Sequence, residues 1–260
     1  MISEIYRFNE TEILLFFMVL MRMTAFAVSW PIFGAETVSA PVKVLFALTL
    51  TLVVFPTLSW SEAQTQAVGQ DLMLLAAREA LIGVTIGFLA RFFFFAFRIA
   101  GEFMSQAMGL GSAQLFNPAL GGQSGAVEQF YVGLASLFYL GVNGHHYLIK
   151  GLAQTFGAVP AAQLSFQTSQ FTGLGRLTQE VMEIGLRLSA PVMISLLVVN
   201  LVLGVIGKTV PQLNVLVTSF PINILVGFGL MIITLPMTME HMGSFLELST
   251  TQIFQLVKTF

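Results

Sequence analysis

Residues 190–237 have the sequence APVMISLLVVNLVLGVIGKTVPQLNVLVTSFPINILVGFGLMIITLPM. Two long apolar runs flank a short polar connection around Lys208 and Pro211, and each run is close to the roughly 20 residues that a helix needs to cross about 30 Å of hydrocarbon. The segment therefore predicts a hairpin of two apolar helices. A second break is expected at Phe220 and Pro221, because proline has no amide hydrogen to donate within a helix.

The same apolar pattern recurs upstream of this hairpin. Hydrophobic residues make up 56% of the chain and charged residues 9%, whereas roughly a quarter of the residues in a soluble domain are charged. Together with a mean hydropathy of +0.85, this composition indicates an integral membrane protein. We predict an all-α fold with six hydrophobic helical segments, at about 12–33, 42–60, 72–100, 126–150, 181–207 and 214–238.

Composition excludes several classes of function. The chain has no cysteine and a net charge of −2, which leaves no thiolate for a metal or a nucleophile and no basic surface for nucleic acid. Asp71 is the sole aspartate, so a membrane aspartyl dyad cannot form within this chain. The adjacent His145 and His146 point about 100° apart on a helix, unlike the i, i+4 spacing of metal-binding histidines. We expect no enzyme activity, no cofactor and no metal.

The N-terminus is acidic ahead of its first apolar run, with Glu4, Glu10 and Glu12. A cleavable signal has a basic region at this place, so we expect the segment to be retained.

Charged residues also lie inside or beside the apolar segments. An ionised group at the centre of a bilayer costs about 2.5–3.5 kcal/mol, so these residues are expected to face protein or water. Three of the arginines are expected to need partners, which favours a subunit of a hetero-oligomer, and the i, i+4 pair at 183 and 187 favours a structural ion pair over a transport relay. The residues are Arg22, Arg91, Arg98, Glu102, Glu183 and Arg187.

Glycines lie at spacings that allow helices to approach closely. The pairs are Gly83 with Gly87, Gly133 with Gly141, and Gly227 with Gly229. Glycine is also simply frequent in membrane helices, which leaves a second interpretation of these pairs.

A long segment without charge separates two of the apolar segments. It is GEFMSQAMGLGSAQLFNPALGGQSGAVE, residues 101–128, and it contains no charged residue between Glu102 and Glu128. Five glycines lie between these two glutamates, at positions 109, 111, 121, 122 and 125. Loops between membrane helices usually meet water and carry charge. The absence of charge therefore indicates that this segment lies in an environment other than that of an ordinary water-exposed loop.

Short motifs follow one another in a fixed order along essentially the whole chain. The residues are Arg22, Pro31, Ile32, Gly101, Glu102, Met108, Gly109, Leu110, Asn117, Pro118, Asn143, Gly144, His145, Asn200 to Gly204, Pro211 to Asn214, Phe220 and Pro221. In this order the chain resembles the FliR/SctT family of type III secretion export-gate proteins. Where some relatives carry Gln and Asp, this sequence has Ala107 and Asn117, so no role of an acid at position 117 is carried over.

The resemblance implies a subunit of the flagellar export gate, through which unfolded flagellar proteins cross the bacterial inner membrane at the basal body. It implies a hetero-oligomeric core with FliP-like and FliQ-like subunits, beside a FlhB-like switch protein and a FlhA-like export protein, and in contact with membrane lipid. The chain would form one domain, 1–260, in which a FliP-like part, 1–180, precedes a FliQ-like hairpin and tail, 181–260.

The resemblance also assigns roles to two segments. Residues 104–125 would be a plug in the channel, where soft apolar groups seal and glycines let the backbone move. The plug residues would be Met104, Met108, Gly109, Gly111, Leu115, Phe116, Asn117, Pro118, Gly121 and Gly122. The tip of the hairpin would contact FliQ-like hairpins and the switch protein through Lys208, Pro211, Gln212, Asn214, Phe220 and Pro221.

The residue patterns alone leave other interpretations open. Met104 and Met108 are four residues apart, as in ordinary core packing, and a neutral glycine-rich segment can be a passive loop. Broken helices and buried charges also occur in secondary transporters. An injectisome subunit of the SctT type would carry the same motifs as a flagellar one.

Overall fold

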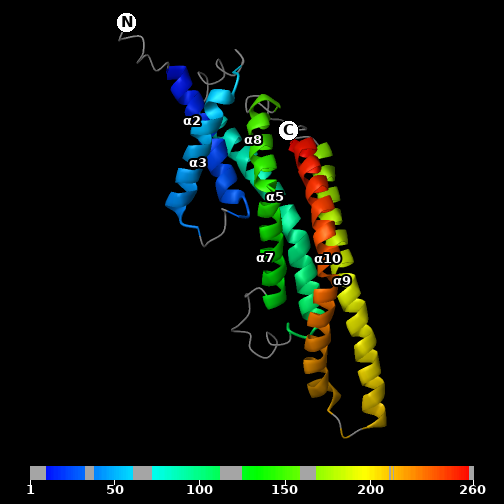
Figure 1. Cartoon of the computed structure of the whole chain (residues 1–260). Coiled ribbons are helices and arrows are strands. Elements are labelled where there is room, and N and C mark those ends of the chain that lie inside the picture. The colour runs from blue at the N-terminus through cyan, green and yellow to red at the C-terminus, as the bar shows by residue number, and fades with distance from the viewer. Residues whose placement is uncertain are drawn as a thin grey trace. The chain divides into compact units, whose positions relative to one another are not determined.

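The computed structural model describes residues 10–32, 38–60, 72–111, 125–158, 168–210, 212 and 214–257. The regular elements in these ranges are helices, which confirms the predicted all-α class. They are α2 (Glu10–Ser29), α3 (Ala40–Val54), the 3₁₀ helix η1 (Phe55–Thr57), α5 (Leu72–Ala107), α7 (Ala126–Gly141), α8 (Gly144–Ala158), α9 (Thr168–Thr209) and α10 (Val215–Val257) (Figure 1).

Within the described residues, five helical stretches are long and apolar enough to cross a membrane. This number and their hydropathy agree with the predicted membrane class. The stretches are Glu10–Ser29, Ala40–Thr57, Leu72–Ala107, Thr172–Thr209 and Val217–Gln255.

The helices form two compact units. Unit 1 combines residues 1–91, 144–175 and 249–260, and unit 2 combines residues 92–143 and 176–248. Each unit is therefore assembled from segments that are far apart in sequence. The long helix α5 begins in unit 1 and ends in unit 2. The resemblance described above divides the chain at residue 180 into a FliP-like and a FliQ-like part. That division compares the chain with other subunits, a likeness that these two units do not test, so it stays a prediction.

The apolar segment predicted at 126–150 is two helices rather than one. Between α7 and α8, Asn143 has a φ of 58°, a left-handed conformation that asparagine tolerates better than most residues do. The amides of Val142 and Asn143 still donate to the carbonyls of Phe138 and Leu140, at 2.9 and 3.1 Å. α7 therefore ends in a closed turn, and the chain changes direction before Gly144.

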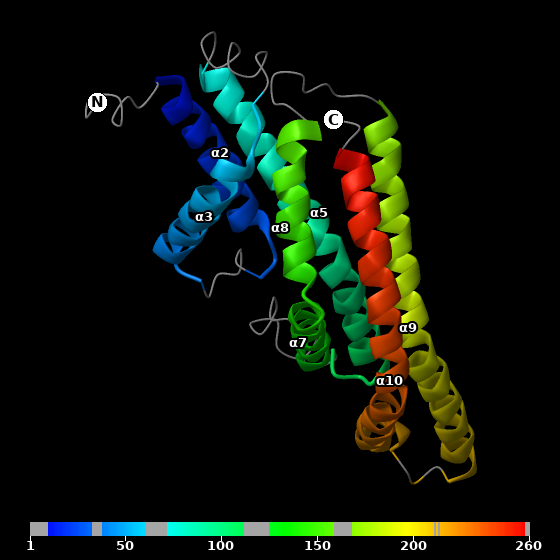
Figure 2. The ribbon, with the colours of Figure 1, turned by 45° about the horizontal axis from the view of Figure 1, so that its top comes forward.

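The last two helices continue through their prolines. α9 contains Pro191, and α10 contains Pro221 and Pro236, so the break predicted at Phe220 and Pro221 is wrong. Each proline removes a single helical hydrogen bond while the bonds on either side remain, and membrane helices tolerate this loss where neighbouring groups supply partners. In unit 2 the two helices lie side by side and run antiparallel (Figure 2), which confirms the predicted hairpin.

Candidate functional site

A buried ion pair joins three helices of unit 1. Arg22 of α2 is fully buried, and its Nε lies 2.5 Å from Oε2 of Glu79 on α5. Its Nη1 donates to the hydroxyl of Thr155 on α8 at 3.0 Å, and the guanidinium lies 4.1 Å from the centre of the Phe156 ring. A charge this deep is stabilised only when it is paired and hydrogen-bonded. The cluster therefore fixes α2, α5 and α8 to one another.

Two glycines and a second arginine complete the contact between α2 and α5. A Cβ atom added at Gly83 would lie 2.3 Å from the carbonyl oxygen of Arg22, and one at Gly87 would lie 2.0 Å from Oγ of Ser29. Arg91 Nε donates to the carbonyl of Ser29 at 2.6 Å, where the C-terminus of α2 favours a cation. The interpretation of Gly83 and Gly87 as a close helix contact is confirmed.

The other predicted glycine pairs do not behave alike. A Cβ atom at Gly133, Gly141 or Gly229 would have no described atom within 4 Å, whereas one at Gly227 would lie 2.5 Å from Cγ of Met108. Within this chain only Gly227 of these four therefore permits a close approach, and its neighbour is the C-terminal end of α5 rather than a helix face.

The neutral segment begins with a well-defined helix end in unit 2. The Gly109 amide donates to the carbonyl of Gln106 and the Leu110 amide donates to the carbonyl of Ser105, both at 3.0 Å. Gly109 has a φ of 80°. These two hydrogen bonds and the left-handed glycine form a Schellman motif, which ends α5 and sets the direction in which the chain leaves it.

The end of α5 packs against α10 through Met108 and Gly109. Met104 and Met108 are fully buried, and Met108 lies over Gly227, as described above. A Cβ atom at Gly109 would lie 2.9 Å from Cδ1 of Phe220, so the backbone of Gly109 approaches this ring closely. Both methionines are therefore packed inside this chain. Their contribution to a plug would be to hold the segment rather than to line an open channel.

The neutral segment ends beside the place where it begins. Glu128 of α7 accepts from the Gly125 amide through Oε2 at 3.2 Å, and its Oε1 lies 2.5 Å from Nε of Arg98 on α5. A Cβ atom at Gly125 would lie 3.0 Å from Oγ of Ser105, and one at Gly101 would lie 2.7 Å from Cα of Glu128. Both ends of residues 104–125 are thus fastened to the last turns of α5.

Several predicted plug residues lie outside the described residues, as does Pro211 of the hairpin tip. The plug residues in question are Leu115, Phe116, Asn117, Pro118, Gly121 and Gly122. Gly111 is described, and a Cβ atom there would meet only Cγ of Gln106, at 3.8 Å.

The described residues of the hairpin tip are mostly exposed. Lys208, Gln212, Asn214 and Pro221 are exposed in this chain, and Phe220 is half-buried against Gly109. Asn214 acts as a helix cap, because its Oδ1 accepts from the Val217 amide at 3.3 Å. Farther along the hairpin, Asn223 Nδ2 donates to Asn200 Oδ1 at 2.9 Å and ties α10 to α9.

The remaining predicted charges lie on the surface of unit 2. Arg187 and Glu183 form an ion pair, as their spacing indicates, with side chains that are 76% and 49% exposed. Glu102 is exposed and accepts from Gln106 Nε2 at 3.3 Å. Because Arg22, Arg91 and Arg98 all have partners within the chain, they no longer argue for a neighbouring subunit.

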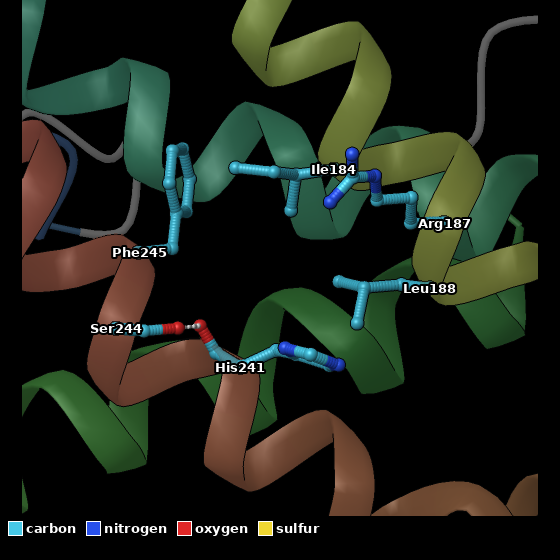
Figure 3. A pocket seen from close by; sticks show the side chains of 6 residues that line it. All are labelled: Ile184, Arg187, Leu188, His241, Ser244 and Phe245. Atoms are coloured by element: carbon cyan, nitrogen blue, oxygen red, sulfur yellow. Dashed lines mark hydrogen bonds between the residues drawn. The ribbon is translucent and has the colours of Figure 1, made fainter.

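A pocket of about 220 Å³ lies between α9 and α10 in unit 2. Figure 3 shows that Arg187 reaches it from α9, while the Ser244 hydroxyl bonds to the backbone carbonyl of His241 at 3.1 Å. Within the chain, Arg187 is paired with Glu183 and the Ser244 hydroxyl is bonded to a backbone carbonyl. The other lining residues are Ile184, Leu188 and Phe245.

A second pocket of unit 2, about 390 Å³, lies between α7 and α10 and is lined only by apolar residues. The second pocket therefore lacks the convergent polar groups with which a transporter holds a small solute. The lining residues of the second pocket are Ala126, Val127, Phe130, Phe228, Met231, Ile232 and Leu235.

Sequence reasoning missed the partners of the predicted residues. Glu79, Thr155 and Phe156 complete the Arg22 cluster, and Glu128 connects Arg98 to the end of the neutral segment. Glu128 had a visible signal, because it is the first charged residue after the neutral stretch.

The chain is similar to known proteins over most of its length. The family model described as bacterial export proteins, family 1, matches residues 13–249. The flagellar biosynthetic protein FliR of Bacillus subtilis (strain 168) is 35% identical over 221 residues, which cover 84% of this chain and 85% of that protein. The protein of the same name in Escherichia coli (strain K12) is 31% identical over 243 residues, which cover 94% of this chain and 91% of that protein.

Proposed function

The chain belongs to the bacterial export proteins of family 1, and from this membership we propose that it is a subunit of the flagellar type III export gate, with residues 104–125 as its plug. The relatives named above are flagellar FliR proteins, which favours the flagellar machine over an injectisome. In this role the chain conducts and gates unfolded proteins across the inner membrane and carries out no covalent step.

The observation that carries the plug assignment is the fastening of an uncharged segment at both ends. The Schellman motif at Gly109 holds its start, and Glu128 holds its end through Gly125 and Arg98. Between Glu102 and Glu128 there is no charged residue. A plug needs fixed ends so that it returns to the same place. It must also lack fixed charges, because a charge in a narrow pore would trap passing chains.

Much of the apolar surface of α9 and α10 is uncovered within the chain, as expected for helices that contact other subunits or lipid. In the most apolar stretches of α9 and α10, only 11% and 17% of the residues are buried within the chain. Large side chains such as Leu201, Leu225 and Ile233 are 64%, 76% and 74% exposed. FliP-like and FliQ-like subunits, with lipid around them, would cover these faces, and the hairpin tip at Lys208 to Asn214 would meet the FlhB-like switch protein.

A permeability measurement tests the plug. Residues 112–122 are deleted in a strain whose only copy of the protein is the variant, and the uptake of a small dye by resting cells is measured together with swimming. We expect increased uptake with an assembled export apparatus, because the deletion leaves both anchors in place. Phe116→Asp and Leu115→Lys should also raise uptake or stall export, since an ionised group in a narrow constriction draws in water or blocks passage.

The outcome that contradicts the proposal is equally specific. A deletion strain that takes up no more dye than the parent and swims normally would show that residues 104–125 are a passive connector.

A further inference from the structure

We propose that Met108 and Gly109 form a latch that holds the start of the plug against α10, and that the gate opens when this latch leaves α10 while α5 stays packed on the hairpin. The inference rests on the proposed plug function and adds to it the place at which the plug is released.

The main contact of the latch is a notch at Gly227. Met108 is fully buried, and its Cγ, Sδ and Cε atoms would lie 2.5, 2.9 and 2.9 Å from a Cβ atom at position 227. The absence of a side chain at Gly227 is therefore what makes room for the methionine. Gly229, two residues on, has open space around its Cβ position, so the notch is specific to one residue of α10.

The second contact lies at the adjacent residue. Gly109 has the left-handed backbone that a Schellman motif requires, and its Cα faces the ring of Phe220, whose Cδ1 and Cε1 would lie 2.9 and 3.0 Å from a Cβ atom. The chain thus leaves α5 between two residues of α10, Phe220 and Gly227, which lie seven positions apart on one face of the helix.

These contacts suit a reversible attachment. Met108 is unbranched and flexible, so it can leave an apolar notch without disturbing a helix backbone. Elsewhere α5 meets the hairpin at Gly185 of α9, where a Cβ atom would lie 2.8 Å from Cγ2 of Ile99 and 3.2 Å from the carbonyl oxygen of Ala96. This contact lies within α5, whereas Met108 and Gly109 lie beyond the last residue of that helix, Ala107. The latch can therefore leave α10 while the helix contact stays.

A reversible cross-link tests the proposal, because the chain has no native cysteine. Met108→Cys with Gly227→Cys is introduced into the full-length protein in cells, and export of flagellar subunits is measured before oxidation, after oxidation and after reduction. The control pair is Ile99→Cys with Gly185→Cys, which joins α5 to the hairpin away from the plug. We expect oxidation to stop export in the latch pair, with recovery on reduction, and to leave export unchanged in the control pair.

A second pair of variants tests the resting state. Gly227→Leu places atoms where Met108 lies and should raise dye uptake by resting cells, whereas Gly229→Leu meets open space in this chain and should not. Equal uptake in both variants would overturn the proposal, as would full cross-linking of 108 to 227 with undiminished export. Failure of the 108–227 pair to cross-link where the 99–185 pair does would also overturn it.

The latch and the plug can fail separately. If deletion of residues 112–122 raises dye uptake but the cross-linked latch still exports, the plug stands and the latch is wrong. If the deletion raises no uptake, the plug assignment itself is wrong.

Discussion

Arg22 shows how a charge can be placed inside a membrane-class protein. Its guanidinium has a carboxylate, a hydroxyl and an aromatic ring as partners, all within unit 1. Removing one member of a buried ion pair leaves an unpaired charge, which costs about 3–5 kcal/mol, whereas replacing both members by apolar groups is often neutral. The pair therefore matters less for its attraction than for the cost of breaking it.

This difference gives the first prediction. Arg22→Met should lower the unfolding temperature of the purified protein strongly, and Arg22→Met combined with Glu79→Met should lower it much less. Arg187→Met provides the control, since its partner Glu183 is on the surface and such exposed i, i+4 pairs contribute only about 0.3–0.5 kcal/mol. Thermal unfolding in detergent measures all three variants. A double variant that is no more stable than Arg22→Met alone would contradict the argument.

The second prediction at this scale separates two glycines of the neutral segment. Gly109→Ala should destabilise the end of α5 by roughly 1–2 kcal/mol, because an L-residue there must adopt a left-handed backbone. Gly111→Ala should have little effect on stability, because its Cβ atom would make only an ordinary contact. Hydrogen exchange of the amides of Gly109 and Leu110 is the measurement. Equal protection in both variants would show that the Schellman motif does not depend on Gly109.

At the scale of the helix, close packing depends on particular glycines. Gly83→Val should separate α2 from α5, since its Cβ atom would lie 2.3 Å from a backbone oxygen that cannot turn away. Overpacking of this kind typically costs 1–3 kcal/mol. Gly133→Val on α7 should leave the unfolding temperature unchanged, because its Cβ position is open. Similar losses in the two variants would remove the claim that Gly83 is the specific contact.

Helix existence could be predicted from the sequence, whereas helix ends and pairings could not. Hydropathy located the apolar segments, but it joined α7 to α8 because Asn143 and Gly144 interrupt the apolar pattern only briefly. The missing amide hydrogen of proline predicted a break at Phe220 and Pro221, but α10 continues through both residues. Partners such as Glu79 for Arg22 depend on which helices meet, and no local pattern contains that information.

At the scale of the whole molecule, the neutral segment could be recognised and its anchors could not. The lack of charge between Glu102 and Glu128 is visible in the sequence. That Glu128 reaches both Arg98 and Gly125, and that Met108 lies over Gly227, follows only from the packing of unit 2. The order of the short motifs along the chain identified the family. Each motif alone is weak, but many of them in the same order are specific.

The last prediction concerns assembly. Detergent covers apolar surface that faces lipid but does not replace subunit contacts, so a chain that works only as a subunit should aggregate when it is expressed alone in detergent. The protein expressed with its FliP-like and FliQ-like partners should instead purify as one stable complex. Mass spectrometry of what accompanies a tagged chain is the measurement.

Cysteines at Thr209 and Gln212, both exposed near the hairpin tip, should cross-link to these partners or to the switch protein, while a cysteine at the buried Met104 should not. A stable monomer with no accompanying subunit would favour a protein that works alone, because a face that needs partners in the membrane should not remain soluble without them.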